Sequence, residues 1–169
     1  FQGESIDSYA ATQGTEGKWT GCAPYSTHLL FFKESHIHKL YGSYPSQFQI
    51  VSQEANGVEY GSERSIAIIE DLVFYKSRIG LLTYGGDRPR LISAAFDNHS
   101  YRNAVCGANR RKYYCSMDNE VGEREFLVYD AATNMWHRED DLNATCFCFY
   151  DEQLLAADSD GNVWIIDGG

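Results

Sequence analysis

The sequence repeats an apolar hairpin pattern four times at nearly constant spacing, and this repetition constrains the fold more than any other feature. In each copy two apolar runs of about five residues flank a polar turn, which is the pattern of a β-hairpin. The copies begin near Leu29, Leu72, Tyr113 and Leu154, at intervals of 43, 41 and 41 residues. A fixed period of this length is typical of repeat architectures, so each copy should be one supersecondary unit.

Further short apolar runs flank the hairpins and complete a four-stranded unit. Runs precede the three later hairpins at residues 65–69, 103–106 and 144–149, and runs follow the first three at 48–51, 90–93 and 135–137. Four short strands per unit predict an all-β, β-propeller-like fold with repeated antiparallel blades of about 42 residues. An ordinary β-sandwich is the rival interpretation, but it does not require self-similarity at a fixed period.

The repeat divides the chain into four expected units within one domain that covers residues 4–169. The units are expected near residues 19–60, 61–102, 103–143 and 144–169. Residues 1–3, Phe-Gln-Gly, resemble the remnant of a purification tag and are set aside.

The fourth unit ends before its fourth strand, so the edge of the last hairpin needs a cover. Residues 5–19 could supply the missing strand and close a ring of four blades. We expect instead that the chain is a partial propeller, a fragment of a larger ring.

Charge and hydropathy disfavour two classes of partner. The formal net charge of −10 opposes binding to a phosphate backbone, so no direct nucleic-acid binding is expected. The compact basic cluster, Arg110-Arg111-Lys112, precedes a strand and is interpreted as a solvated turn. No apolar run reaches about eighteen residues, so no membrane-spanning helix is expected.

The five cysteines do not form a complete disulfide framework, because their number is odd. Cys146 and Cys148 alternate along an apolar strand and should share one face. They could bind a soft metal, but no partner ligands are apparent. We interpret them as small core residues of a protein in a reducing compartment.

Three other polar clusters have residue types that occur in metal sites. His36 and His38 share a strand face, but a metal site needs further ligands, and a polar outward face is expected. Residues 158–162 resemble the start of a calcium loop, yet Val163 stands where that loop requires glycine, so a hairpin turn is expected. The acidic run 139–141 is interpreted as a solvated loop.

No catalytic constellation is apparent. The sequence contains no Gly-x-Ser-x-Gly elbow and no glycine-rich phosphate loop. We therefore predict a protein that is not an enzyme, with no catalytic, cofactor-binding or metal-binding residue and no cofactor.

One segment resembles a kelch blade. Residues 129–136, Tyr-Asp-Ala-Ala-Thr-Asn-Met-Trp, are similar to the kelch element in which Asp and Asn build the turn and Trp packs between blades. Only one of the units carries this element, and Gly85-Gly86 follows its hairpin, whereas kelch blades place a glycine pair inside the preceding strand.

A broader pattern resembles phage structural proteins of the packaged-DNA stabilisation or head–tail joining kind. The segments that carry it are residues 30–42, 62–69, 71–86, 90–93, 112–116, 126–136 and 138–140. This resemblance implies a virion component at the neck, near the portal or in the tail, assembled in the bacterial cytoplasm. Its expected partners are other virion proteins, with self-association into a ring as one form of assembly.

Two other functions stay open from the sequence. A carbohydrate-binding or glycosidase-like propeller would use the abundant tyrosines and tryptophans for sugar stacking, although the same aromatics could fill the space between blades. A kelch-like scaffold would bind peptides, and it should repeat the Tyr-Asp…Trp element in each blade.

Overall fold

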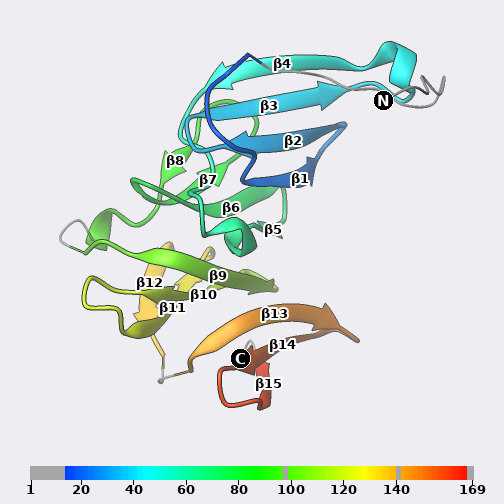
Figure 1. Cartoon of the computed structure of the whole chain (residues 1–169). Coiled ribbons are helices and arrows are strands. Elements are labelled where there is room, and N and C mark those ends of the chain that lie inside the picture. The colour runs from blue at the N-terminus through cyan, green and yellow to red at the C-terminus, as the bar shows by residue number, and fades with distance from the viewer. Residues whose placement is uncertain (1–13, 97–98, 140–141, 167–169) are drawn as a thin grey trace.

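The structure is a computed structural model in which residues 14–96, 99–139 and 142–166 are described. Within these ranges the chain forms four antiparallel sheets, each made of consecutive strands (Figure 1). The first sheet contains β1 (Gly21–Tyr25), β2 (His28–Lys33), β3 (His36–Tyr41) and β4 (Gln49–Glu54). The second contains β5 (Ala67–Ile69), β6 (Leu72–Ser77), β7 (Gly80–Tyr84) and β8 (Arg90–Leu91).

The third and fourth sheets continue the pattern. The third contains β9 (Arg102–Asn109), β10 (Lys112–Asp118), β11 (Arg124–Asp130) and β12 (Met135–Arg138). The fourth contains three strands, β13 (Ala144–Tyr150), β14 (Gln153–Asp158) and β15 (Val163–Ile166). The predicted all-β fold of repeated antiparallel sheets is thus confirmed.

Helical structure in the described ranges is limited to three single turns of 3-10 helix. These are η1 (Pro45–Gln47), η2 (Glu63–Ser65) and η3 (Ala94–Phe96). None of the helices in the described part of the chain has the length and apolar character needed to cross a membrane.

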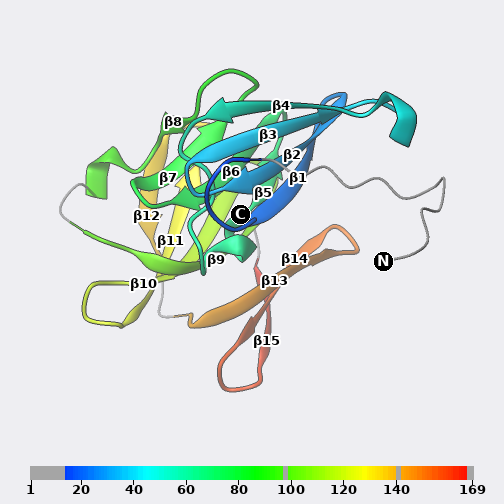
Figure 2. The same cartoon turned by 45° about the horizontal axis from the view of Figure 1, so that its top comes forward.

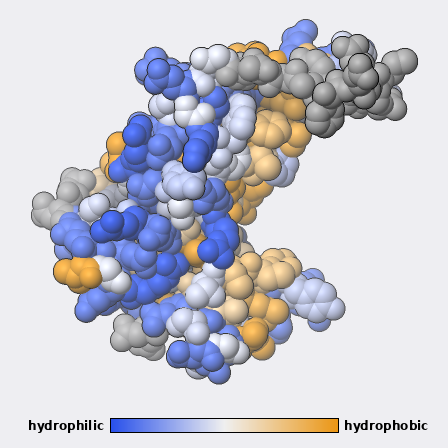
Figure 3. Space-filling model, in the orientation of Figure 1, coloured by the Kyte–Doolittle hydropathy of each residue, from blue (hydrophilic) through white to orange (hydrophobic). Residues whose placement is uncertain are grey.

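The four sheets follow one another along an open arc (Figures 1 and 2). The space-filling view has a C-shaped outline, with the first sheet and the fourth sheet on either side of the gap (Figure 3). The described segment 14–19 forms no strand and lies against the first sheet, where Lys33 Nζ donates a hydrogen bond of 2.6 Å to the carbonyl of Thr15. This part of the opening segment therefore does not pair with β15; residues 5–13, like the expected tag remnant, lie outside the described residues.

A two-residue turn at the start of each hairpin fixes which positions are equivalent. The turns join β1 to β2, β5 to β6, β9 to β10 and β13 to β14. A residue of each turn has positive φ: Ser26 (49°), Glu70 (53°), Arg110 (54°) and Asp151 (48°). Such φ values suit the tight turns that match strand twist. The second residue after the turn therefore occupies the same position in each sheet. These equivalent residues are Leu29, Val73, Tyr113 and Leu154.

The core lies between successive sheets. Aromatic pairs span all three internal interfaces. Ring centroids are 5.1 Å apart for Phe32 and Tyr75, 5.1 Å for Phe74 and Tyr113, and 6.2 Å for Phe126 and Phe147. Of the tyrosines and tryptophans that suggested a sugar-binding role, Tyr75, Tyr84, Tyr113, Tyr114 and Tyr129 are buried in this packing, whereas Trp19, Trp164, Tyr44, Tyr60 and Tyr150 are exposed.

Candidate interaction faces

Each sheet presents one face to the sheet before it and one to the sheet after it, because side chains alternate along a strand. On the backward faces, the central strands of the second and third sheets bury apolar residues at equivalent positions. These are Val73, Tyr75, Leu82 and Tyr84 in the second sheet and Tyr113, Cys115, Leu127 and Tyr129 in the third. On the forward faces, Leu30, Phe32 and Ile37 of the first sheet, Phe74 and Leu81 of the second, and Tyr114, Phe126 and Val128 of the third are buried.

The backward face of the first sheet has no preceding sheet in the described chain. We call it the leading face; its members are Trp19, Cys22, Leu29, Phe31, His38, Leu40 and Ile50. Most of them line an open hollow of about 540 Å³. Leu29 is 43% exposed, whereas its equivalents Val73 and Tyr113 are fully buried.

The His38 ring, on the leading face, contacts two hydroxyl groups. Ser52 Oγ lies 2.7 Å from His38 Nδ1, and Thr15 Oγ1 lies 3.2 Å from Nε2. Burial, and then the positive charges of Lys33 and His36, lower the pKa of His38. Lys33 Nζ also lies 4.7 Å from the centroid of the Trp19 ring. The lowered pKa favours the neutral form of the His38 ring, which lies between the hydroxyl groups of Thr15 and Ser52.

The forward face of the fourth sheet is likewise uncovered in the described chain. We call it the trailing face; its members are Cys146, Cys148, Leu155, Ala157, Val163 and Ile165. Val163 is 68% exposed and Ile165 is 61% exposed. Their equivalents Phe126 and Val128 in the third sheet are buried against the fourth. In Figure 3, apolar surface is visible on both arms of the C-shaped outline.

The cysteine prediction is therefore half right. Cys146 and Cys148 do share a face, but both are exposed, so they are not core residues of this chain. Cys22 is exposed too, whereas Cys106 and Cys115 are buried between the second and third sheets. The pattern of strand alternation identified the face correctly, but it could not show that none of the other sheets in residues 14–96, 99–139 and 142–166 packs on that face.

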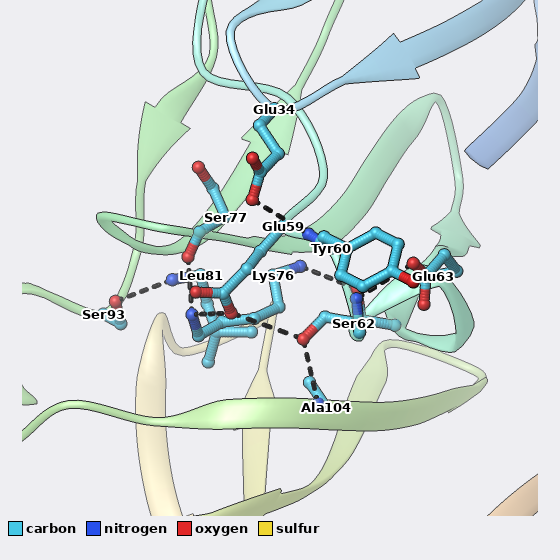
Figure 4. A network of polar contacts seen from close by, with 12 residues as sticks. Glu34, Glu59, Tyr60, Ser62, Glu63, Lys76, Ser77, Leu81, Ser93 and Ala104 are labelled. Carbon is cyan, nitrogen blue, oxygen red and sulfur yellow. Dashed lines mark hydrogen bonds and ion pairs between the residues drawn. The ribbon is translucent and has the colours of Figure 1, made fainter. Parts of the chain in front are cut away.

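A buried polar cluster links the second and third sheets (Figure 4). Lys76 Nζ forms an ion pair of 2.8 Å with Glu59 Oε2, and the Lys76 side chain is only 3% exposed. Ser62 Oγ accepts a hydrogen bond from the backbone N–H of Ala104 on β9. The Lys76 ammonium, the Glu59 carboxylate and the Ser62 hydroxyl all find partners within the protein, so these groups position the connector between β4 and β5.

Arg110-Arg111 of the basic cluster and Glu139 lie in connections between strands, but His36 and His38 lie on the inner strand β3. His38 is only 1% exposed, so the predicted polar outward face is wrong for His38. Arg110-Arg111 forms the β9–β10 turn, and Arg111 Nε lies 3.2 Å from Glu70 Oε1 in the equivalent turn of the second sheet. The rings of His36 and His38 are 6.0 Å apart. Glu139 follows β12, and residues 140–141 lie outside the described residues. In the described ranges no group of three His, Cys, Asp or Glu side chains could hold a metal ion.

The kelch-like segment has the local structure that its residues suggest. Asp130 Oδ1 accepts hydrogen bonds from the N–H groups of Ala132 and Thr133, and Asn134 adopts a positive φ of 57°. Trp136 Nε1 donates a 2.8 Å hydrogen bond to the carbonyl of Ile92, which follows β8 of the second sheet. Trp136 thus ties the third sheet to the second.

Comparison with known proteins shows the fold and no family. No family model and no curated protein sequence matches the chain. The computationally designed Ika4 protein has a similar structure, with a TM-score of 0.61 and 12% identity over 94% of this chain and 96% of that one. PorZ, a surface component of the type-IX secretion system of Porphyromonas gingivalis, aligns with a TM-score of 0.41 and 10% identity, over 90% of this chain and 27% of PorZ.

Proposed function

We propose that this protein is a non-catalytic structural component of a phage virion that binds other virion proteins through its leading and trailing faces. The main support for binding through these faces is their exposed apolar residues. Leu29, Val163 and Ile165 are exposed, whereas the equivalent residues are buried at the internal interfaces. Exposed apolar surface of this kind marks protein–protein contact sites. The virion location rests on the sequence resemblance described above.

The test uses particles of the phage that encodes this protein. We expect its peptides in purified virions by quantitative mass spectrometry. Leu29→Glu on the leading face and Val163→Glu on the trailing face should each reduce incorporation at least tenfold, because a carboxylate cannot be buried without a partner. Val121→Glu is the matched control, since Val121 is 78% exposed in the β10–β11 turn, outside both faces.

Two results would overturn the proposal. One is the absence of the protein from the particles. The other is unchanged incorporation of both face variants, which would show that the faces are not binding surfaces. Saturable binding on a glycan array, abolished by substitution of exposed aromatic residues, would favour the carbohydrate-binding alternative.

A further inference from the structure

We propose that the trailing face of one copy of this chain docks on the leading face of a second copy, head to tail. The joint would repeat the sheet-to-sheet packing found three times within the chain. This inference rests on the proposed function, because it names a partner for the same two faces.

The first argument is continuity with the internal interfaces. In each of them a forward face packs on a backward face, and the described part of the chain leaves one face of each kind without a covering sheet; only residues such as Thr15 and Trp19 contact the leading face. A second copy supplies the matching face in the same strand register. Pairing two leading faces or two trailing faces would combine surfaces of the same kind, which no internal interface does.

The second argument is steric. At the third internal interface Gly107 on β9 lies against Phe147 on β13, where a Cβ on Gly107 would come within 2.8 Å of the Phe147 Cβ. By strand register, Cys22 is equivalent to Phe147 and Cys148 to Gly107. At the joint, Cys22 and Cys148 would therefore take the places of Phe147 and Gly107. Two side chains of intermediate size replace one large side chain and a glycine, which roughly conserves the packed volume.

The third argument is charge at the turns that open the hairpins. These turns are Glu70-Asp71 in the second sheet, Arg110-Arg111 in the third and Asp151-Glu152 in the fourth, so the charge of the turn alternates in sign from the second sheet to the fourth. The turn of the first sheet, Ser26-Thr27, is uncharged. A head-to-tail joint in the internal register places Asp151-Glu152 beside this neutral turn, where no like charge opposes it.

Sedimentation velocity on the purified chain tests the proposal. The monomer has a mass of 19.1 kDa, and we expect species of two copies or more that dissociate on dilution. Leu29→Glu alone and Val163→Glu alone should each raise the dissociation constant at least tenfold, while Val121→Glu should leave it unchanged. A mixture of the Leu29→Glu and Val163→Glu chains should form dimers, because each supplies the intact face that the other lacks.

Mild oxidation with copper phenanthroline tests the register. A cross-link between Cys22 and Cys148 or Cys146 of another copy, mapped by mass spectrometry and lost in Cys22→Ser, is expected. Three results would overturn the inference. The chain could stay monomeric when its concentration is raised 100-fold, from roughly 10 µM to roughly 1 mM. The mixture of variants could fail to dimerise, or cross-links could form only between two Cys146 residues. Circular dichroism of each variant establishes that it is folded.

The two proposals fail separately. If the chain is monomeric and the face variants are still excluded from virions, other virion proteins cover the faces and the head-to-tail joint is wrong. If the chain assembles head to tail but is absent from virions, the joint stands and the virion function is wrong.

Discussion

At the residue scale, Asp158 shows how one carboxylate can organise a turn. Its Oδ2 accepts hydrogen bonds of 2.7 Å from Trp164 Nε1 and 2.9 Å from Asn162 Nδ2. Its Oδ1 accepts from the backbone N–H groups of Asp160 and Asn162. The donors surround the carboxylate, so the resemblance of residues 158–162 to a calcium loop reflects turn chemistry, as the sequence predicted. Hydrogen bonds to the charged form, that from Trp164 first, lower the pKa of Asp158 to about 2.

Substituting Trp164 should raise this pKa. In Trp164→Phe the strongest donor is lost, and the pKa of Asp158 should move toward its ordinary value of 3.8, as measured by NMR titration of the side-chain carboxyl. Trp136→Phe is the control, because Trp136 donates to the Ile92 carbonyl and not to Asp158.

The sign of the linked stability follows from the lowered pKa. The folded state favours the charged carboxylate, so its contribution is complete above the unfolded pKa of about 3.9 and is lost as the pH falls through about 2. The acid-unfolding midpoint of Trp164→Phe should therefore lie at higher pH than that of the parent chain. An unchanged pKa in Trp164→Phe would contradict this account.

At the element scale, the connector of residues 55–66 fastens three sheets together. Its Gly57 N–H donates to the carbonyl of Glu34 in the first sheet, and Glu59 pairs with Lys76 in the second. Tyr113 of the third sheet donates through its hydroxyl to the carbonyl of Ser65, at 2.6 Å. The connector thus acts as a structural element of the core although most of it is irregular.

Gly57→Ala should destabilise the fold. A Cβ at this position would overlap the backbone carbonyl of Lys33, which has no flexible end to move aside. We expect a loss of about 2–3 kcal/mol in the free energy of unfolding, measured by urea denaturation. Gly14→Ala, where no atom lies within 4 Å of the new Cβ, should leave it within about 0.5 kcal/mol. A loss at Gly57 as small as that at Gly14 would contradict the close packing of the connector.

The elements differ in how well the sequence predicted them. The central hairpins are correct because their apolar runs are long, yet Leu72 proves one residue away from the true equivalent of Leu29, which is Val73. Strand β1 was not predicted, and it contains Pro24, which has no N–H to donate; this proline is tolerated because β1 is an edge strand. The predicted strand at 65–69 begins as the 3-10 turn η2, and β5 covers only Ala67–Ile69.

At the scale of the whole molecule, the sequence does not reveal what covers the leading and trailing faces. Apolar alternation predicts that Cys146 and Val163 belong to a packed face, but it does not say which polypeptide covers that face. The repeat period predicted the four sheets, but it carries no information on the curvature of the arc that they form. The structure shows these residues uncovered within the described chain, and this turns a packing pattern into a proposal about assembly.

An arc of stacked sheets should also unfold unevenly. In repeat architectures each unit is stabilised by its neighbours, and an end unit has only one. Within the described residues, the fourth sheet has three strands and packs its backward face on the third sheet, whereas β6 and β10 are covered on both faces. Amide hydrogen exchange in dilute solution should therefore be fastest in β13–β15 and slowest in β6 and β10.

Raising the protein concentration should slow exchange in β14 and β15 and leave β10 nearly unchanged, because a second copy covers the trailing face. Equal protection of all four sheets in dilute solution would contradict the stacked arrangement, and protection of β14 and β15 that does not depend on concentration would contradict the joint between copies.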